Sequence, residues 1–235
     1  MSYRNIVVLT GAGISAESGL KTFRDNNGLW ENHRFEEVAT PEAFAANPAL
    51  VYRFYNQRRQ QLLSAEVQPN AAHVALAEFS REYKGRCLLV TQNVDNLHER
   101  AGSAAVLHMH GELLSARCLN SQRSMPVYTD VDASSQCQCC QPAAGMRPDI
   151  VWFGEIPKFM PAIEQQLTQC DLFVAIGTSG NVYPAAGFVQ LARLAGAHTV
   201  ELNLVASVGQ SYFAELHYGP ASEIVPRFFK QLSSK

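Results

Sequence analysis

The sequence lacks a strong excess of either charge and lacks any long hydrophobic run. Its 19 Lys and Arg residues stand against 21 Asp and Glu residues, which leaves a formal net charge of −2. This balance gives no electrostatic reason to expect binding to nucleic acid or to an anionic membrane. Purely aliphatic or aromatic runs, such as Leu172–Ile176, are far shorter than the ~20 residues that span a bilayer. We therefore expect neither nucleic acid nor membrane as a partner.

Cysteine is scarce, and a secretory signal is missing. The 235 residues include six cysteines, three of them in Cys137-Gln138-Cys139-Cys140. The first apolar run, Ile6–Leu9, has the length of a strand and leads into glycines, which is not a signal-peptide pattern. Reduced thiols that form a metal site or pack in a core are therefore favoured over a disulfide framework. The cytoplasm is the expected compartment.

Short apolar runs indicate an α/β fold. Hydrophobic residues make up 47% of the chain, enough for a sizeable core. Helix-like segments separate several strand-like runs, which is typical of a Rossmann-like parallel sheet covered on both faces. The predicted strands are Ile6–Leu9, Cys87–Thr91, Leu172–Ile176 and Thr199–Leu202. Ligands of such sheets bind at the carboxyl ends of the strands. Four polar or glycine-rich loops should meet there: Gly11–Ser15, Gln92–Asp95, Gly177–Gly180 and Asn203.

Two stretches interrupt this alternation of strands and helices. Asn32 to Tyr83 shows helical patterns but no convincing strand, and Cys118 to Arg147 is polar and without periodicity. We interpret both as insertions that form a smaller lobe. The predicted division assigns residues 1–31, 84–112 and 148–235 to a large nucleotide-binding domain, 32–83 to a helical insertion and 113–147 to a zinc-ribbon-like module.

A glycine turn follows the first predicted strand. Gly11-Ala12-Gly13-Ile14-Ser15-Ala16 should open a helix and matches a dinucleotide-binding turn, with Ala16 in the third small position. A tight strand-to-helix turn without a ligand is an equally good interpretation of this motif alone. The acidic ribose ligand expected about 20 residues later is missing. The turn therefore predicts a dinucleotide site that differs from that of an ordinary dehydrogenase.

Polar residues follow two further strands. Gln92, Asn93 and Asp95 place two amides and a carboxylate on one turn, where they suit a ribose, an amide or a developing cation. Helix capping would need only one of them. His108 and His110 follow Val106-Leu107, and a histidine at this edge suits general-base chemistry near neutral pH. A structural role is the better interpretation of either histidine alone. We take His110, beside Gly111 at this edge, as the candidate base, and we expect His108 to lie on the opposite face of the extended segment and to serve packing.

The cysteine spacing is similar to that of a zinc ribbon with one ligand missing. Cys118 is followed by Ser121 where a second cysteine belongs, and Cys137 and Cys140 follow at suitable distances. Serine is a poor zinc ligand, and structural zinc sites normally have four ligands. We predict a weakened or vestigial zinc site of Cys118, Cys137 and Cys140, which Cys139 could complete only after local rearrangement. A metal-free cluster packed as core is the alternative.

Five blocks of the sequence together resemble the sirtuins, which are NAD-dependent protein-lysine deacylases. The blocks occur in the order typical of the family and extend from Ile6 to about Ala221. They are Gly11–Ser15 with Thr22-Phe23-Arg24-Asp25, then Thr91–Asp95, His110-Gly111, Trp152–Glu155 and Gly177–Ser179. The segment Tyr55-Asn56-Gln57-Arg58 is similar to the class III branch of bacterial sirtuins.

The resemblance implies removal of acyl groups from protein lysines, with NAD consumed and nicotinamide and O-acyl-ADP-ribose released. His110 would be the catalytic base, and Asn93 and Asp95 would act beside it. Val151, Phe153 and Gly154 would pair with the acyl-lysine peptide as an added strand. The implied NAD contacts are Gly11, Ala12, Gly13, Ser15, Phe23, Arg24, Trp30, Gln92, Asn93, Asp95, Gly177, Thr178, Ser179, Asn203, Leu204, Val205 and Ala221. Val205 departs from the family pattern, which has a polar or acidic residue there.

The helix predicted around residues 49–63 carries an unexpected cation. Arg58 lies on an apolar stripe, four residues after Phe54 and four before Leu62. Tyr55 lies beside it, whereas Arg59 should point away and be solvated. Snorkelling or an internal salt bridge would explain Arg58. The resemblance instead implies that Tyr55 and Arg58 receive the carboxylate of a succinyl or malonyl group, while an acetyl group still fits.

Two other functions fit parts of the sequence. An atypical NAD-dependent dehydrogenase would share the glycine turn, but it would need the acidic ribose ligand that is missing. A non-catalytic NAD-binding or zinc-scaffold protein would have no need of His110 at the ligand-binding edge. The sequence favours the deacylase over both alternatives.

Overall fold

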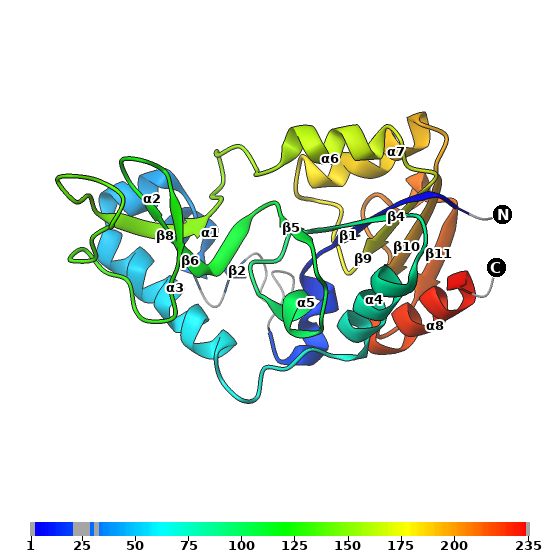
Figure 1. Ribbon diagram of the computed structural model, residues 1–235, viewed down its shortest axis with the longest axis horizontal. Helices are drawn as coiled ribbons and strands as arrows, with labels where there is room; N and C mark the ends of the chain where they lie inside the picture. Colours follow the sequence, from blue (N-terminus) through cyan, green and yellow to red (C-terminus); the bar gives the residue numbers. More distant parts are fainter. Residues whose placement is uncertain (1–2, 21–28, 31–32, 234–235) are drawn as a thin grey trace.

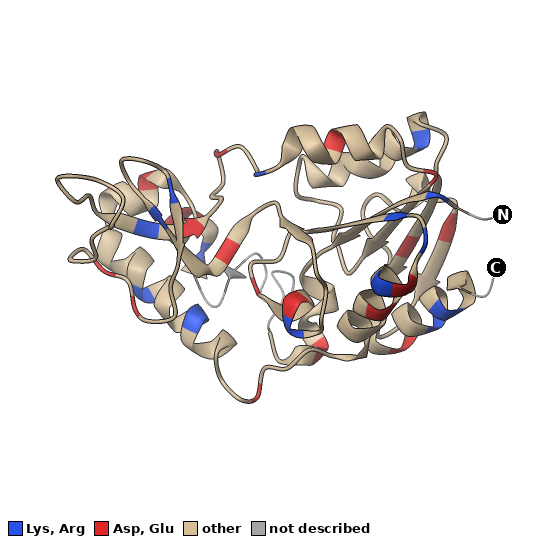
Figure 2. Cartoon of the chain, viewed as in Figure 1, with Lys and Arg blue, Asp and Glu red and all other residues tan. Residues whose placement is uncertain are grey.

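The computed structural model describes residues 3–20, 29–30 and 33–233. Phe23 and Arg24 lie outside these residues, and Trp30 is described only by its backbone. Within these ranges, none of the helices combines the length and the apolar character that crossing a membrane requires. In the view of Figure 2, Lys and Arg residues are interspersed with Asp and Glu residues at both ends of the molecule.

A six-stranded parallel sheet forms one end of the molecule (Figure 1). Its strands, in spatial order, are β11 (Glu215–Tyr218), β10 (His198–Asn203), β9 (Leu172–Ile176), β1 (Asn5–Thr10), β4 (Arg86–Thr91) and β5 (Val106–His108). The four strands predicted from apolar runs are confirmed to within one residue at each end. Edge strand β11 was not predicted, because its residues alternate between half-buried and exposed and form no apolar run.

Helices cover both faces of this sheet. The helices α4 (Ala71–Glu82) and α8 (Ala221–Ser233) pack together on one face, and α6 (Met160–Leu167) and α7 (Phe188–Leu194) lie on the other (Figure 1). Side chains of β1 alternate between the two resulting cores: Val8 faces α4 and α8, and Val7 faces α6 and α7. This burial on both faces explains why the strands are continuous apolar runs, and it confirms the Rossmann-like sheet.

The other end of the molecule combines helices with a small antiparallel sheet (Figure 1). This sheet has the order β7 (Ser124–Pro126), β6 (Gly111–Cys118) and β8 (Met146–Ile150). The helices beside it are α1 (Phe35–Val38), α2 (Pro41–Ala46) and α3 (Pro48–Leu62). The short strands β2 (Leu29–Trp30) and β3 (His33–Arg34) pair with each other, and α5 (Leu97–Arg100) follows β4. Residues of α3, β6 and β8 share one apolar cluster that includes Phe54, Leu113 and Ile150.

The division of the chain into domains stays a prediction. The helices α1–α3 and the strands β6–β8 gather at one end of Figure 1. Helix α4, however, falls within the predicted 32–83 insertion but packs on α8 and on the large sheet through Ala72, Leu76 and Phe79. The part of the insertion that packs with the smaller sheet therefore ends before α4.

The glycine turn folds differently from the prediction of an α-helix. Two 3₁₀ turns, Ala12–Ile14 and Ala16–Ser18, follow β1 instead. Further 3₁₀ turns are Ala185–Gly187 and Gln210–Tyr212. A Cβ atom on Gly13 would lie only 2.7 Å from the Cα atom of Gly177, so glycine is required for the loops after β1 and β9 to touch.

Candidate active site

One large cleft extends from the carboxyl edge of the parallel sheet to α3 and the small antiparallel sheet. Its volume is about 790 Å³, which falls within the ~300–1,000 Å³ range of cofactor and substrate pockets. The sequence-predicted residues that line it are Gly11, Ala12, Gly13, Ser15, Tyr55, Arg58, Gln92, Asn93, Asp95, His110, Val151, Phe153, Gly154, Gly177, Thr178, Ser179, Asn203, Leu204, Val205 and Ala221. The structure thus brings together every predicted NAD, catalytic and substrate residue whose side chain it describes.

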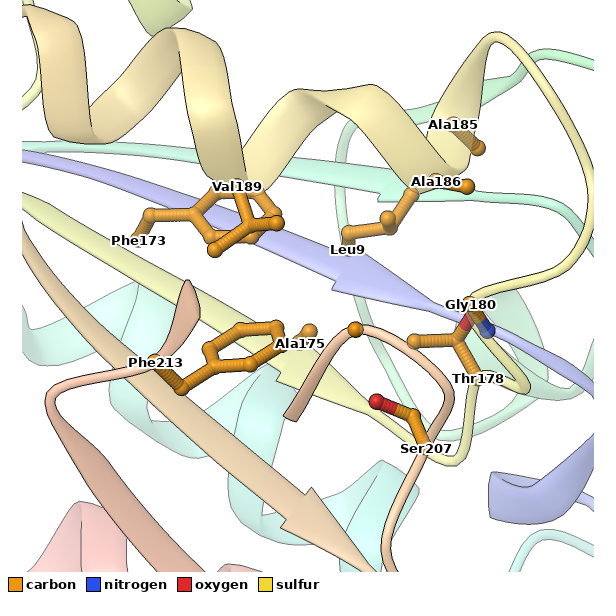
Figure 3. Close-up of a pocket in the computed structure, with 11 residues that line it drawn as sticks. Leu9, Phe173, Ala175, Thr178, Gly180, Ala185, Ala186, Val189, Ser207 and Phe213 are labelled. Carbon is orange, nitrogen blue, oxygen red and sulfur yellow. The ribbon is translucent and has the colours of Figure 1, made fainter. Parts of the chain in front are cut away.

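A second cavity lies behind Thr178 and is far smaller (Figure 3). Its volume is about 20 Å³, room for about one water molecule. Phe173, Val189 and Phe213 turn their side chains toward it from the sheet and its neighbours (Figure 3). This cavity is a packing void, and it is too small for a cofactor.

Side-chain amides tie the loops of the cleft to one another. Gln92 donates a hydrogen bond to Thr178 Oγ1 at 3.2 Å, and Asn203 donates to the Thr178 carbonyl at 2.8 Å. Asn93 donates to the Gly11 carbonyl at 3.2 Å. The carboxyl ends of four neighbouring strands, β10, β9, β1 and β4, therefore form a common rim around the cleft.

Asp95 lies at the floor of this rim and is 5% exposed. Ser15 Oγ donates to one carboxylate oxygen at 3.0 Å, and the backbone N–H of Leu97 donates to the other at 3.0 Å. Burial raises the pKa of Asp95, and these two hydrogen bonds oppose the rise. The bond from Leu97 closes an Asx turn just before α5, whose N-cap residue is Asn96 and has no side-chain capping bond, so Asp95 is not the helix cap that the sequence left open. The bond from Ser15 links Asp95 to the glycine turn.

His110 lies between β5 and β6, at the wall of the cleft. Its Nδ1 atom is 3.1 Å from the carbonyl oxygen of Gln92. A carbonyl only accepts hydrogen bonds, so Nδ1 carries the hydrogen and Nε2 is the basic nitrogen of the neutral ring. Burial lowers the pKa of His110, and the hydrogen bond to Gln92 opposes this. The neutral form that a general base needs is therefore favoured near pH 7.

His108, two residues earlier, has the opposite electrostatic environment. Nδ1 lies 3.1 Å from the carbonyl oxygen of Asn93, and Nε2 lies 2.8 Å from a carboxylate oxygen of Glu99. Both nitrogens face acceptors, so both carry hydrogens. Burial alone would lower the pKa of His108, but Glu99 outweighs it and the pKa is raised. The packing role predicted for His108 is therefore incomplete, because its ring also anchors the turn that holds Asn93.

Tyr55 and Arg58 both line the cleft from α3, on the side where the resemblance to the sirtuins placed them. Tyr55 is fully buried, and the Arg58 guanidinium lies 5.1 Å from the centre of the Phe54 ring. The prediction that Arg59 is solvated is wrong: its side chain is 1% exposed and donates to the Leu113 carbonyl at 2.9 Å. Strand β6 covers this second face of α3, and no helical periodicity could reveal that contact.

The segment after β8 forms a turn whose backbone is already engaged. The N–H groups of Val151 and Phe153 donate to the carbonyls of His110 and Ala39, at 2.8 and 2.9 Å. The N–H of Trp152 donates to a Glu155 carboxylate oxygen at 2.8 Å. A peptide strand along this segment would therefore meet mainly carbonyl groups. The sequence pointed to this block, but it did not assign roles to Trp152 and Glu155.

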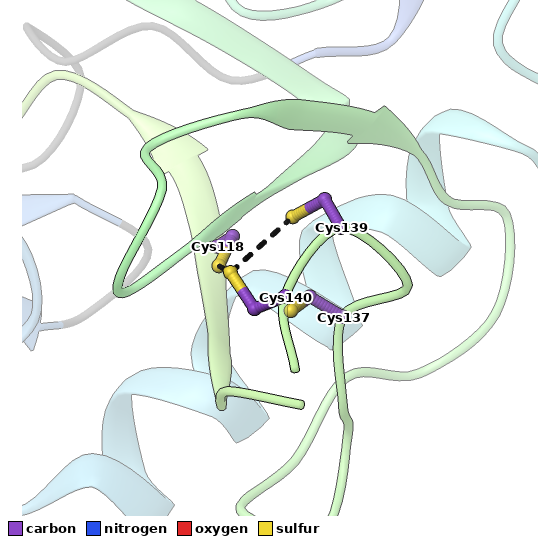
Figure 4. Close-up of side chains that lie close together, drawn as sticks. All are labelled: Cys118, Cys137, Cys139 and Cys140. Carbon is purple, nitrogen blue, oxygen red and sulfur yellow. Dashed lines mark hydrogen bonds between the residues drawn. The ribbon is translucent and has the colours of Figure 1, made fainter. Parts of the chain in front are cut away.

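Four cysteines gather at the end of β6 (Figure 4). The sulfur atoms of Cys118, Cys137, Cys139 and Cys140 all lie within 4.8 Å of one another. The Cys118–Cys140 and Cys139–Cys140 sulfur distances are 3.7 and 3.9 Å. Tetrahedral zinc with ~2.3 Å bonds to sulfur places its ligands about 3.8 Å apart. Cys139 thus supplies the fourth thiol that the sequence pattern lacked at Ser121, and a three-ligand, vestigial site is no longer the best interpretation.

Comparisons with known proteins agree with this geometry. A model of the Sir2 family matches residues 11–184. The chain is 59% identical over 226 residues to an NAD-dependent protein deacylase of Pasteurella multocida, covering 96% of this chain and 97% of the relative. It is 57% identical over 232 residues to an NAD-dependent protein deacylase of Escherichia coli, covering 99% and 83%.

Solved structures show the same similarity in three dimensions. A Sir2 homologue in complex with NAD has a TM-score of 0.88 at 35% identity and covers 99% of this chain and 90% of its own. A Sir2–p53 peptide–NAD⁺ complex has a TM-score of 0.82 at 28% identity, with coverages of 99% and 95%. The family model spans well over half of the chain, and the relatives match it over nearly its full length. The chain therefore belongs to the Sir2 family, which confirms the resemblance to the sirtuins.

Proposed function

We propose that this protein is an NAD-dependent protein-lysine deacylase. One observation carries the proposal: a single cleft holds a neutral, oriented histidine, the polar turn Gln92–Asp95 and the glycine loops of a dinucleotide site. The reaction transfers the acyl group of a modified lysine to the ADP-ribose part of NAD and releases nicotinamide and free lysine. The deacylases of Pasteurella multocida and Escherichia coli and the NAD-bound Sir2 homologue support the assignment.

The residues of the cleft fit a dinucleotide. Gln92, Asn93 and Asp95 would hold the nicotinamide end, and Gly177, Thr178, Ser179 and Asn203 would hold the phosphates and the adenosine ribose. The apolar side chains of Leu204 and Val205 are 67% and 56% exposed and line the cleft near Ala221. An adenine ring stacked there would cover this apolar surface, so the polar residue expected in place of Val205 is not required.

His110 would act as the base. Its Nε2 atom is the acceptor nitrogen, so the ring can take a proton from a ribose hydroxyl while Nδ1 stays bonded to Gln92. Asn93 and Asp95 would orient the sugar as the bond to nicotinamide breaks and positive charge develops.

We further propose that the cleft accepts acidic acyl chains as well as acetyl. The Arg58 guanidinium would bind the distal carboxylate of succinyl- or malonyl-lysine as a fork, and the Tyr55 hydroxyl would add a hydrogen bond. Arg58 and Tyr55 both line the cleft on the small-lobe side. Acetyl-lysine lacks the distal carboxylate, so its turnover should not need these contacts.

The acylated protein is proposed to bind as an extended peptide along Val151, Phe153 and Gly154. The Sir2–p53 peptide–NAD⁺ complex among the similar structures supports a peptide substrate. We also propose a cytoplasmic, reducing location, because all six cysteines of the chain are free thiols.

A structural zinc ion is proposed at Cys118, Cys137, Cys139 and Cys140, whose sulfur spacing suits a closed four-thiolate site. Elemental analysis of protein purified without added metal should find about one zinc per chain, and Cys139→Ser should lower that content. If the Cys139→Ser protein still bound one zinc ion per chain, Cys139 would not be the fourth ligand, and Ser121 would be the candidate for that position. Zinc-free protein with full activity would show that packing alone holds this module.

Incubation of an acetylated peptide with NAD tests the function. Release of nicotinamide that depends on the peptide is the expected result. Absorbance from NADH would instead support the dehydrogenase, and neither product would support a non-catalytic NAD-binding or zinc-scaffold protein.

A further inference from the structure

Trp152 connects the acyl end of the cleft to the protein interior. Its indole Nε1–H donates a hydrogen bond to the Tyr55 hydroxyl oxygen at 3.0 Å. Trp152 is 2% exposed and Tyr55 is 0% exposed, so water does not compete for this bond. A hydrogen bond in such surroundings is stronger than in water and fixes the geometry of both partners.

The indole is itself held from behind. The guanidinium carbon of Arg147 lies 3.3 Å from the centre of the Trp152 ring, and Arg147 binds both carboxylate oxygens of Glu155, at 2.8 and 2.9 Å. The same carboxylate accepts the backbone N–H of Trp152 at 2.8 Å. Ring and backbone of Trp152 are therefore anchored to one ion pair. The cation over the ring also draws electron density from the indole and makes its N–H a better donor.

The direction of this hydrogen bond decides what the Tyr55 hydroxyl can do. An indole N–H is only a donor, so the Tyr55 oxygen must accept. The hydroxyl hydrogen of Tyr55 then points away from the indole. Burial raises the pKa of Tyr55, which keeps the hydroxyl protonated and able to donate. Arg58 follows three residues later on α3, and both residues line the cleft.

We infer that Trp152 is a positioning residue for acidic acyl chains: its indole N–H orients the Tyr55 hydroxyl to donate to the distal carboxylate of succinyl- or malonyl-lysine. The Arg147–Glu155 pair holds the indole in the orientation from which its N–H reaches the Tyr55 oxygen. The inference rests on the proposed deacylase function and adds to it a residue that acts through Tyr55. An acetyl group has no distal carboxylate, so this device should not affect deacetylation.

Kinetics of Trp152→Phe, Tyr55→Phe and the double variant test the inference on one peptide bearing either succinyl- or acetyl-lysine. Without the indole N–H the Tyr55 hydroxyl is no longer oriented toward the distal carboxylate, so Trp152→Phe should raise the KM for the succinyl peptide about 3–10-fold, comparable to the contribution of one hydrogen bond. The KM for the acetyl peptide should change less than about twofold, because no hydrogen bond to it is lost. Because Trp152 acts through Tyr55, the double variant should match Tyr55→Phe. Equal losses on both substrates, or effects that multiply in the double variant, would overturn the inference.

Phe44→Leu is the matched control for packing. The Phe44 ring packs on Trp152 with 5.3 Å between ring centres, and it has no polar atom to orient Tyr55. This variant should keep the wild-type ratio of succinyl to acetyl KM. A ratio shifted as in Trp152→Phe would assign the selectivity to packing. Thermal melts of each variant, compared at the same pH, identify any loss that comes from unfolding.

NMR of the indole N–H groups gives a readout that does not need activity. The chain has two tryptophans, so Trp152→Phe assigns the Trp152 signal directly. In Tyr55→Phe, the Trp152 indole proton should move upfield because its acceptor is lost. An unmoved signal would overturn the inference even in an active enzyme. If the Trp152 signal moves between wild type and Tyr55→Phe but the wild-type protein releases no nicotinamide from acetylated peptide and NAD, the proposed function is refuted and the hydrogen bond is not.

Discussion

The two ends of the cleft are built in different ways. The nucleotide end is made of loops that follow adjacent strands of one parallel sheet, and its glycines and amides lie within a few residues of those strands. The acyl end is made of single side chains from α3 and from the segment after β8, which pack together only in the folded chain. The first end should therefore be sensitive to backbone changes, and the second to single side-chain groups.

The largest effect is expected at the nucleotide end from His110→Ala. Removal of a general base should lower kcat about 10²–10⁴-fold, while NAD binding stays largely intact. Single-turnover assays with titration of NAD by fluorescence or calorimetry measure both quantities. His108→Ala provides the comparison: if it abolished activity in a folded protein while His110→Ala did not, the base would have been misassigned.

At the acyl end, Arg58→Met should separate the substrates. Loss of a charge-assisted contact costs roughly 1.5–3 kcal/mol, so the KM for succinyl-lysine should rise about 10–100-fold. The KM for acetyl-lysine should stay nearly unchanged. Arg53→Met, on an exposed position of the same helix, should leave both values alone. Equal losses on both substrates after Arg58→Met would make Arg58 structural and remove succinyl and malonyl groups from the proposal.

A methyl group on Gly13 tests how much backbone contact the nucleotide end needs. The added Cβ would lie 2.7 Å from the Cα of Gly177. The atoms nearest to it are all backbone atoms of Gly177, so no flexible side chain can move away to make room. Gly13→Ala should therefore lower the free energy of unfolding by about 1–3 kcal/mol and raise the KM for NAD. Gly187→Ala, where the nearest atom is 3.8 Å away on a side chain, is the control. Equal urea midpoints for the two variants would contradict close contact between the loops.

The smallest effects are expected from pH, and they distinguish the two histidines. The pKa of His110 is lowered from 6.5, so the acid limb of kcat/KM should have its midpoint below pH 6.5. The pKa of His108 is raised from 6.5, so its charged contact stabilises the fold fully below that pH. That contribution is lost as pH rises through the raised pKa. The stability difference between wild type and His108→Gln should shrink on this alkaline side. A difference that grows with pH would mean that His108 is neutral in the fold.

The contrast between the two ends also explains what the sequence could predict. Strands such as β9 can be predicted from their apolar runs. The parallel topology of the sheet then places Gln92 and Thr178 on the same rim. Buried Arg59, the fourth thiol of Cys139 and the bond between Trp152 and Tyr55 depend on which surfaces meet after folding. Such contacts join residues distant in the chain or differ from the family spacing, so periodicity and motif spacing contain no signal for them.

The position of His110 between β5 and β6 has a mechanical consequence. The chain passes directly from the large sheet into the small sheet at this residue, and the N–H of Val151 on the substrate side donates to its carbonyl at 2.8 Å. On the other side, the ring is bonded to Gln92, which belongs to the nucleotide rim. Because His110 is bonded to both sides, a change in the angle between the two sheets would also change the orientation of the imidazole ring.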